Sequence, residues 1–144
     1  MSWVLITCFV VQVLSAGSAE LYLNDDKREL AIGVQHAICN DDFALADSLG
    51  CLLGELFPDD PMGPFSRAAS LLGEMFDREE PLQSERFLVL LEIADSLASQ
   101  TVDTASPGMA AWMAFYRGHV RSYRALWEAR FGSSLQAIRL GYAA

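Results

Sequence analysis

The sequence predicts an all-α fold, built as stacked helical hairpins or as a compact bundle of short antiparallel helices. From residue 27 onward, apolar side chains recur at the three- and four-residue spacing of helices. Prolines and capping residues separate these segments. There is no β-hairpin turn signal, and no sustained two-residue alternation outside an apolar run near the N-terminus. Because the connections are short, consecutive helices are expected to be antiparallel neighbours in space.

The first three helices are delimited by caps and prolines. One is expected over Lys27–Asn40. The second, Phe43–Phe57, is ended by Pro58, which cannot continue a helix. The third is expected over Pro61–Phe76, because Asp60 suits the cap position and proline suits the first helical position.

The second half of the chain predicts three more helices. Pro81 opens the fourth, and Pro107 leads into a long fifth helix that includes Met109–Phe131. Ser133 and Gln136 have the spacing of a capping box, in which each side chain bonds the backbone N–H of the other. They predict a short terminal helix.

The fifth helix carries the densest aromatic content of the chain and its only row of arginines. At 3.6 residues per turn, these two sets fall on different faces. One face carries Trp112, Tyr116, Val120, Tyr123 and Trp127, and another carries Arg117, Arg121 and Arg124. The aromatic face is expected to be core. The arginines are either a solvated face or a docking surface for acidic groups, in this chain or in a partner.

Charge is unevenly distributed along the 144 residues, whose net charge is −9. Residues 20–103 hold 18 acidic and 5 basic side chains, whereas residues 104–144 hold 1 acidic and 5 basic ones. Nucleic-acid binding is not expected, because its affinity comes mainly from Lys and Arg neutralising phosphates. The chain is long enough to bury a core without a metal or disulfides, and residues 20–144 are expected to form one domain.

Residues 1–19 contain no charged side chain. The apolar run Trp3–Leu14 is followed by small residues, with Gly17 and Ala19 placed for cleavage of a secretory leader after Ala19. No Lys or Arg precedes the run, which favours the alternative of a retained first helix. The run is too short to predict a stable membrane span. The protein is expected to be cytoplasmic if the segment is retained and secreted if it is removed.

No catalytic, metal or cofactor site is predicted. Asp41, Asp42 and Asp47 resemble an aspartate-rich segment that binds magnesium diphosphate, but no second acidic cluster completes such a site. The first two are better suited to capping a helix. If the chain is secreted, Cys39 and Cys51 could pair across a helical hairpin; the other interpretation is buried free thiols.

Small residues recur at positions that suggest helix stacking. Several positions resemble those of the tetratricopeptide repeat: a small residue in the first helix at Gly33, a small residue at the helix crossing at Ala46 and a closing proline at Pro58. Gly73 followed by Phe76 resembles the first-helix signature of the same family. Gly33 and Gly73 are 40 residues apart, whereas the repeat of that family is about 34 residues long. This resemblance implies stacked helical hairpins. In size, acidity and expected architecture, the chain is also similar to small chaperones of type III secretion.

These observations predict a non-catalytic adaptor or chaperone that holds a helical segment of another protein in an apolar groove. The predicted groove is lined by Leu72, Phe76, Trp112, Tyr116 and Tyr123, with Arg117, Arg121 and Arg124 at its rim. A homodimer is a further expectation. The alternative function is a secreted helical effector or carrier, released by cleavage after Ala19.

Overall fold

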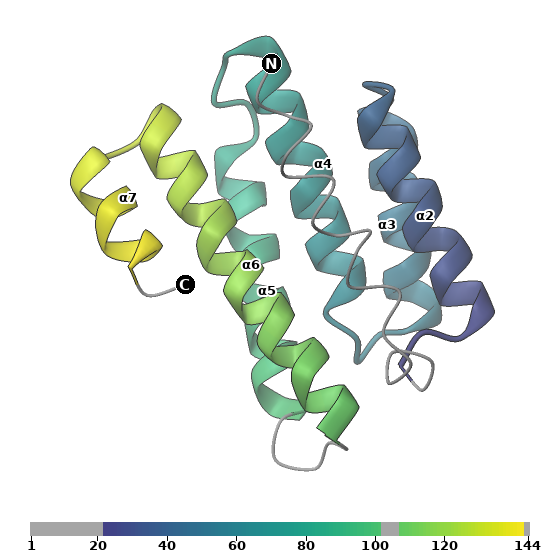
Figure 1. The fold of residues 1–144 in the computed structure, drawn as a ribbon. Helices are drawn as coiled ribbons and strands as arrows, with labels where there is room; N and C mark the ends of the chain where they lie inside the picture. The colour runs from purple at the N-terminus through teal and green to yellow at the C-terminus, as the bar shows by residue number, and fades with distance from the viewer. Residues whose placement is uncertain (1–21, 102–106, 143–144) are drawn as a thin grey trace.

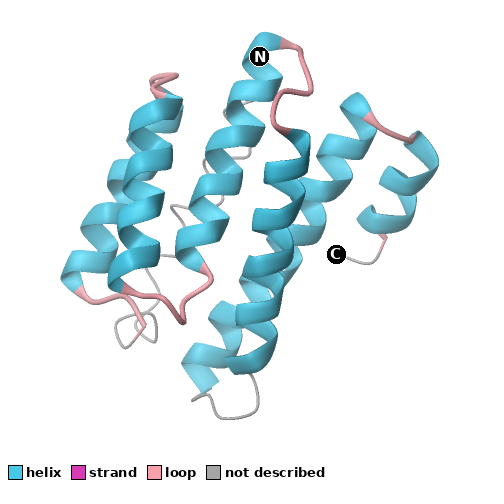
Figure 2. Ribbon diagram, turned by 180° about the vertical axis from the view of Figure 1, so that it is seen from behind, coloured by secondary structure: helices cyan, strands magenta, loops and turns pink. Residues whose placement is uncertain are grey.

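The computed structural model describes residues 22–101 and 107–142, and these residues form an all-helical fold (Figure 1). The helices are α2 (Asp25–Cys39), α3 (Phe43–Leu56), α4 (Met62–Arg78), α5 (Ser84–Thr101), α6 (Pro107–Phe131) and α7 (Ser134–Gly141). The described residues contain no strand, which confirms the predicted fold class (Figure 2). The predictions for residues 1–19 lie outside the described part of the chain.

The helices form a row of three hairpins: α2 with α3, α4 with α5, and α6 with α7. Helices α2, α4 and α6 lie side by side in one layer, and α3 and α5 lie behind them (Figure 1). Among the described helices, no Cα atom of α2 or α3 comes within 8 Å of α6 or α7. The backbones of the first and last of these hairpins therefore do not meet, as in a hairpin stack and unlike a closed bundle.

Local signals explain where the first helices begin. The Asn24 side chain accepts a hydrogen bond from the Lys27 N–H, and Asp42 accepts one from the Leu45 N–H. The Asp60 carboxylate accepts from the Met62 N–H at 2.9 Å, but Pro61 takes the cap position and α4 begins at Met62, so the predicted cap and first helical residue are each displaced by one position. Each acceptor satisfies a backbone donor that has no partner within the helix.

The capping box predicted for the terminal helix is wrong. Ser133 makes no side-chain capping bond; instead, its own N–H donates to Glu128 Oε2 at 2.9 Å. The carboxylate folds across Gly132, where an added Cβ would lie only 2.2 Å from that oxygen. A glycine at this position leaves the space that this alternative bond requires. A second predicted boundary also differs: the sequence predicts that the fourth helix opens at Pro81, but this helix, α5, begins at Ser84.

The closest backbone approach among the described glycines joins α3 and α4. A Cβ added to Gly63 would lie 2.6 Å from the Gly54 Cα atom, so a side chain at Gly63 would force these helices apart. The predicted small positions make looser contacts with side chains: Gly33 faces Leu49, and Gly73 faces Phe43. The small residues therefore do permit close packing, but the tightest crossing is at a pair that spacing did not single out.

Two clusters form the hydrophobic core. One joins α2, α3 and the first half of α6, with Leu53 and Met113 almost fully buried. The other joins α4, α5 and the second half of α6, around Phe87 and Met75. Phe65 packs against both clusters, which makes the interior continuous. Among the described helices, none combines the length and apolar character that crossing a bilayer requires.

Candidate functional site

The structure buries three of the five predicted groove residues and leaves Phe76 and Tyr123 partly buried against the core. Leu72, Trp112 and Tyr116 are at most 8% exposed. Phe76 contacts Phe131 edge to face at a centroid distance of 5.7 Å, and Tyr123 stacks on Phe65 at 5.0 Å. In this conformation, these side chains pack against other residues of the same chain in two core clusters and do not line an open groove.

The three predicted rim arginines do not act as one set. Arg117 Nε lies 3.4 Å from Asp95 Oδ1 on α5. Arg121 is half-buried and also interacts with another group of this chain. Arg124 is exposed. A further pair joins Arg130 to Glu79 at 3.0 Å. The basic helix therefore meets acidic residues of this chain at Asp95 and at Glu79.

Aromatic rings connect α4 and α6 with Tyr22, which lies three residues before the first residue of α2. Tyr22 stacks on Trp112 at 5.2 Å, and Phe65 contacts Tyr116 edge to face at 5.3 Å. Burial raises the pKa of the Tyr123 phenol to about 12. The row thus consists of neutral rings, and it accounts for the burial of the aromatic face of α6.

His119 borders this aromatic row. Its ring lies 4.0 Å from the Phe115 ring, and its Nδ1 is 3.1 Å from the Phe115 carbonyl oxygen. Burial lowers the pKa of the His119 imidazole, although the bond to the carbonyl acts in the opposite direction. The neutral ring is therefore the favoured form at pH 7, consistent with a role in packing.

A buried ion pair lies at one end of the aromatic row. Lys27 Nζ on α2 is 2.6 Å from Asp60 Oδ2, and the two side chains are 10% and 9% exposed. The Tyr22 hydroxyl donates to Asp60 Oδ1 at 2.5 Å. Lys27 Nζ also lies over the Tyr22 and Phe57 rings, at 4.3 and 4.7 Å. This centre links the start of α2 with the start of α4.

The two tyrosines beside this pair are held neutral. Burial, with the neighbouring Tyr116 and Asp60 groups adding to it, raises the pKa of the Tyr22 hydroxyl far above its usual range. Burial and the nearby Asp60 charge do the same to the pKa of Tyr116. A hollow of about 360 Å³ adjoins the pair, and its other lining residues include Met109.

The Asp60 centre has little free capacity for chemistry. Its carboxylate accepts from the Tyr22 hydroxyl, the Lys27 ammonium and the Met62 N–H. No side-chain nitrogen or oxygen buried among the described residues lacks a partner. A carboxylate with three donors is a poor general base, so the arrangement acts as a structural connection. Sequence reasoning placed Asp60 at the start of the third predicted helix and missed its partner Lys27, which is 33 residues away.

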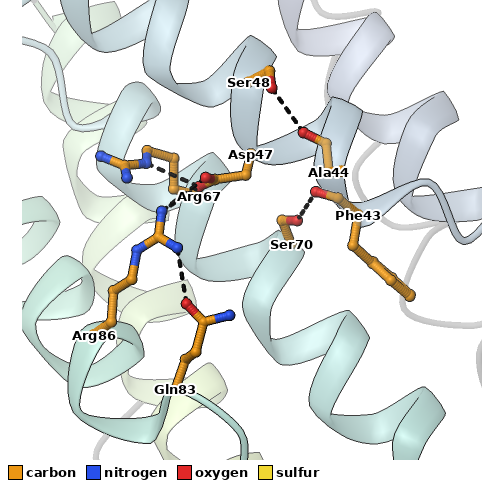
Figure 3. Close-up of polar contacts among 8 residues, drawn as sticks. All are labelled: Phe43, Ala44, Asp47, Ser48, Arg67, Ser70, Gln83 and Arg86. Atoms are coloured by element: carbon orange, nitrogen blue, oxygen red, sulfur yellow. Dashed lines mark hydrogen bonds and ion pairs between the residues drawn. The ribbon is translucent and has the colours of Figure 1, made fainter.

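A second polar centre joins three helices at Asp47 on α3 (Figure 3). Arg86 from α5 bonds both Asp47 carboxylate oxygens, at 2.9 and 2.7 Å, and Arg67 from α4 bonds Oδ1 at 3.0 Å. Gln83 accepts a hydrogen bond from the same Arg86 at 2.9 Å. On the other side of this contact, the Ser70 hydroxyl donates to the Phe43 carbonyl at 2.8 Å.

These arginines determine the charge state of Asp47. Burial would raise the pKa of its carboxyl, but hydrogen bonds and charges from Arg86 and Arg67 outweigh that effect and lower the pKa. Asp47 is therefore an anion paired with two guanidinium groups. No group of three metal-ligating side chains occurs within residues 22–101 and 107–142. The carboxylate that the sequence placed near a magnesium motif has a structural role instead.

The cysteine pairing considered from sequence is wrong for this fold. Cys39 ends α2, whereas Cys51 lies eight residues into α3, about 12 Å along its axis from the connection between the helices. A disulfide requires Cα atoms within about 7 Å. Both thiols are free, Cys39 is exposed and Cys51 is half-buried, so the alternative of buried thiols is only partly correct.

Three helices each expose two or more large apolar side chains. They are Leu45 (47% exposed), Leu52 (39%) and Leu56 (55%) on α3, Val89 (48%) and Ile93 (44%) on α5, and Leu135 (59%) and Ile138 (57%) on α7. On α5, Val89 and Ile93 border a shallow hollow of about 310 Å³ that also includes Glu92 and Ser96. Contiguous apolar groups on a surface commonly mark interaction sites.

Comparisons with protein-family models, curated proteins and solved structures give no match to this chain. The resemblance to tetratricopeptide repeats and to secretion chaperones therefore stays a prediction from sequence.

Proposed function

We propose that this protein is a non-catalytic helical scaffold that binds an amphipathic helix of another protein along the outward face of α5. The observation that carries the proposal is the exposed pair Val89 and Ile93, one helical turn apart beside a shallow hollow. Residues four apart on a helix lie on the same face, so they form a short apolar stripe that a partner helix can cover.

The neighbours of this stripe favour a partner with basic residues at its edge. Glu92 lines the hollow and Glu85 is exposed one turn before Val89. No Cα atom of α3 lies within 8 Å of α5, so among the described helices the backbone of α3 does not cover this face. Charge complementarity at a rim increases association rate and specificity.

The absence of catalysis is part of the proposal, and the two polar centres support it. Asp60 accepts from three donors, and Asp47 is bonded by two guanidinium groups. Both arrangements hold helices together. The predicted partner is unchanged, a helical segment of another protein, but the proposed contact lies on α5. The alternative of a secreted effector depends on residues 1–19, which lie outside the described part of the chain.

Site-specific photocrosslinking in the native host tests this function. A benzophenone side chain replaces Ile93 in one variant and Glu29, an exposed residue on α2, in the control. We expect a discrete adduct with one protein from the position on α5, and loss of that adduct when Val89 is also replaced by serine. Equal labelling from both positions, or no adduct from Ile93 in a folded protein, would contradict the proposal.

A further inference from the structure

We propose that copies of this chain associate head to tail, with α7 of one copy docked on the outer edge of the α2–α3 hairpin of the next. The proposal concerns different residues from those of the partner site on α5 and goes beyond that function. It rests on apolar stripes at the two opposite ends of the row of hairpins, on their charges, and on the way in which the hairpins already stack.

The first stripe lies on α3. Leu45, Leu52 and Leu56 are spaced by seven and four residues and therefore share one face. This face points away from α4, because the opposite face of α3 carries the close contacts of Gly50 and Gly54 with α4. These three side chains are each more than one-third exposed to solvent.

The second stripe lies on α7, at the other end of the row. Leu135, Ile138 and Tyr142 are spaced by three and four residues, and Tyr142 at the end of the helix is 92% exposed. Among the described helices, α7 contacts α6 alone and has no fully buried residue. An amphipathic helix gains most of its stability from covering its apolar face, so α7 has a face that is available to a second chain.

The charges of the two ends are complementary. Residues 25–56 hold seven carboxylates and two basic groups, whereas residues 121–142 hold four arginines and one glutamate. Near the stripes, Glu55 is exposed on α3 and Arg139 is exposed on α7. Contact between unlike ends brings opposite charges together. A twofold contact between two α3 faces would bring like charges together, so the charges favour the head-to-tail arrangement over a symmetric dimer.

The hairpins of one chain already stack in the manner that the proposal extends. Helix α4 packs on both helices of the preceding hairpin, and α6 packs on both α4 and α5. In the head-to-tail contact, the outer edge of the α2–α3 hairpin of a second copy, which carries the α3 stripe, lies beside α6 and α7, where a further hairpin of the row would lie. Contacts between unlike surfaces produce open chains unless the rotation closes a ring, and terminal hairpins of helical arrays need a cover.

Analytical ultracentrifugation of the full chain, over a range of protein and salt concentrations, tests the proposal. We expect the average mass to rise with concentration beyond that of a dimer. Added salt should weaken association, because the contact pairs opposite charges. Charge reversal by Arg139→Glu should weaken it by about tenfold. Val89→Ser, which changes only the α5 stripe, should leave self-association unchanged.

Mixing two blocked variants distinguishes head-to-tail from symmetric contact. Leu52→Glu blocks the first end and Tyr142→Asp blocks the second; the second residue is so exposed that folding should be unaffected. Each variant alone should be monomeric, and their mixture should form a one-to-one dimer that grows no further. A dimer from either variant alone, or a wild-type monomer at every concentration, would overturn the proposal; the latter includes the case in which residues 1–21 cover a stripe.

Discussion

Asp60 and Asp47 each connect separate parts of the chain through a carboxylate, but their surroundings differ. The Asp60 side chain is 9% exposed and meets one ammonium group, whereas the Asp47 side chain is 27% exposed and meets two guanidinium groups. Solvent screens the second centre and hardly reaches the first. The number of partners is therefore a poor guide to the energetic importance of an ion pair, and burial is the better one.

The physical reason lies in what remains when one partner is removed. At the buried centre, loss of Lys27 would leave Asp60 charged in an apolar environment beside Tyr22 and Phe57. Such an uncompensated charge is costly, even though the intact pair adds little net stability. At Asp47, water can replace part of a lost hydrogen bond, and a second arginine remains. The comparison predicts a graded series of mutational effects.

The largest effect is expected from breaking the buried pair. Lys27→Met should lower the free energy of unfolding by about 3–5 kcal/mol, because it leaves the Asp60 carboxylate without its cation. Chemical denaturation followed by circular dichroism measures the change. The matched control is Lys27→Met combined with Asp60→Leu, which removes both charges and should recover most of the loss. A small loss in the single variant would show that the centre is hydrated.

The buried pair also illustrates what sequence reasoning could and could not reach. Helix boundaries, including the start of α4 near Asp60, depend on residues a few positions apart, so proline positions and apolar spacing predicted them closely. The Lys27–Asp60 pair depends on how α2 packs beside α4, which spacing does not encode. Likewise, the period of α6 identified its buried aromatic face, but it could not show that Tyr22 and Phe65 of the same chain cover it.

A smaller effect is expected at the half-exposed centre. Asp47→Asn keeps the shape of the side chain and removes its charge, so we expect a loss of about 1 kcal/mol in unfolding free energy. High salt should reduce this loss, because the pair is partly screened by solvent. A cycle that combines Asp47→Asn with Arg86→Gln measures the coupling directly. A loss as large as that of Lys27→Met would contradict the proposed role of burial.

Acid should also reduce the stabilisation from the Asp47 centre, and we expect this loss of unfolding free energy to be smaller than that caused by Asp47→Asn. Arg86 and Arg67 outweigh burial and lower the folded-state pKa of Asp47, so folding favours the ionised carboxylate. Its contribution is complete above the unfolded pKa of about 3.9 and is lost as pH falls through the lower folded value. Below about pH 4, wild type should therefore lose stability more steeply than Asp47→Asn. Parallel curves for the two proteins would show that this carboxylate does not titrate as expected.

The smallest effect is expected at an exposed pair on α2. Arg28 lies 3.3 Å from Asp25, but the two side chains are 45% and 96% exposed. Because solvent screens both charges and each side chain loses freedom in forming the contact, Arg28→Gln should change the unfolding free energy by at most about 0.5 kcal/mol. Thermal unfolding at low and high salt provides the measurement. If Arg28→Gln clearly lowered the unfolding free energy even in high salt, the exposed Arg28–Asp25 pair would behave like the buried Lys27–Asp60 pair. Burial would then not explain the difference between the ion pairs.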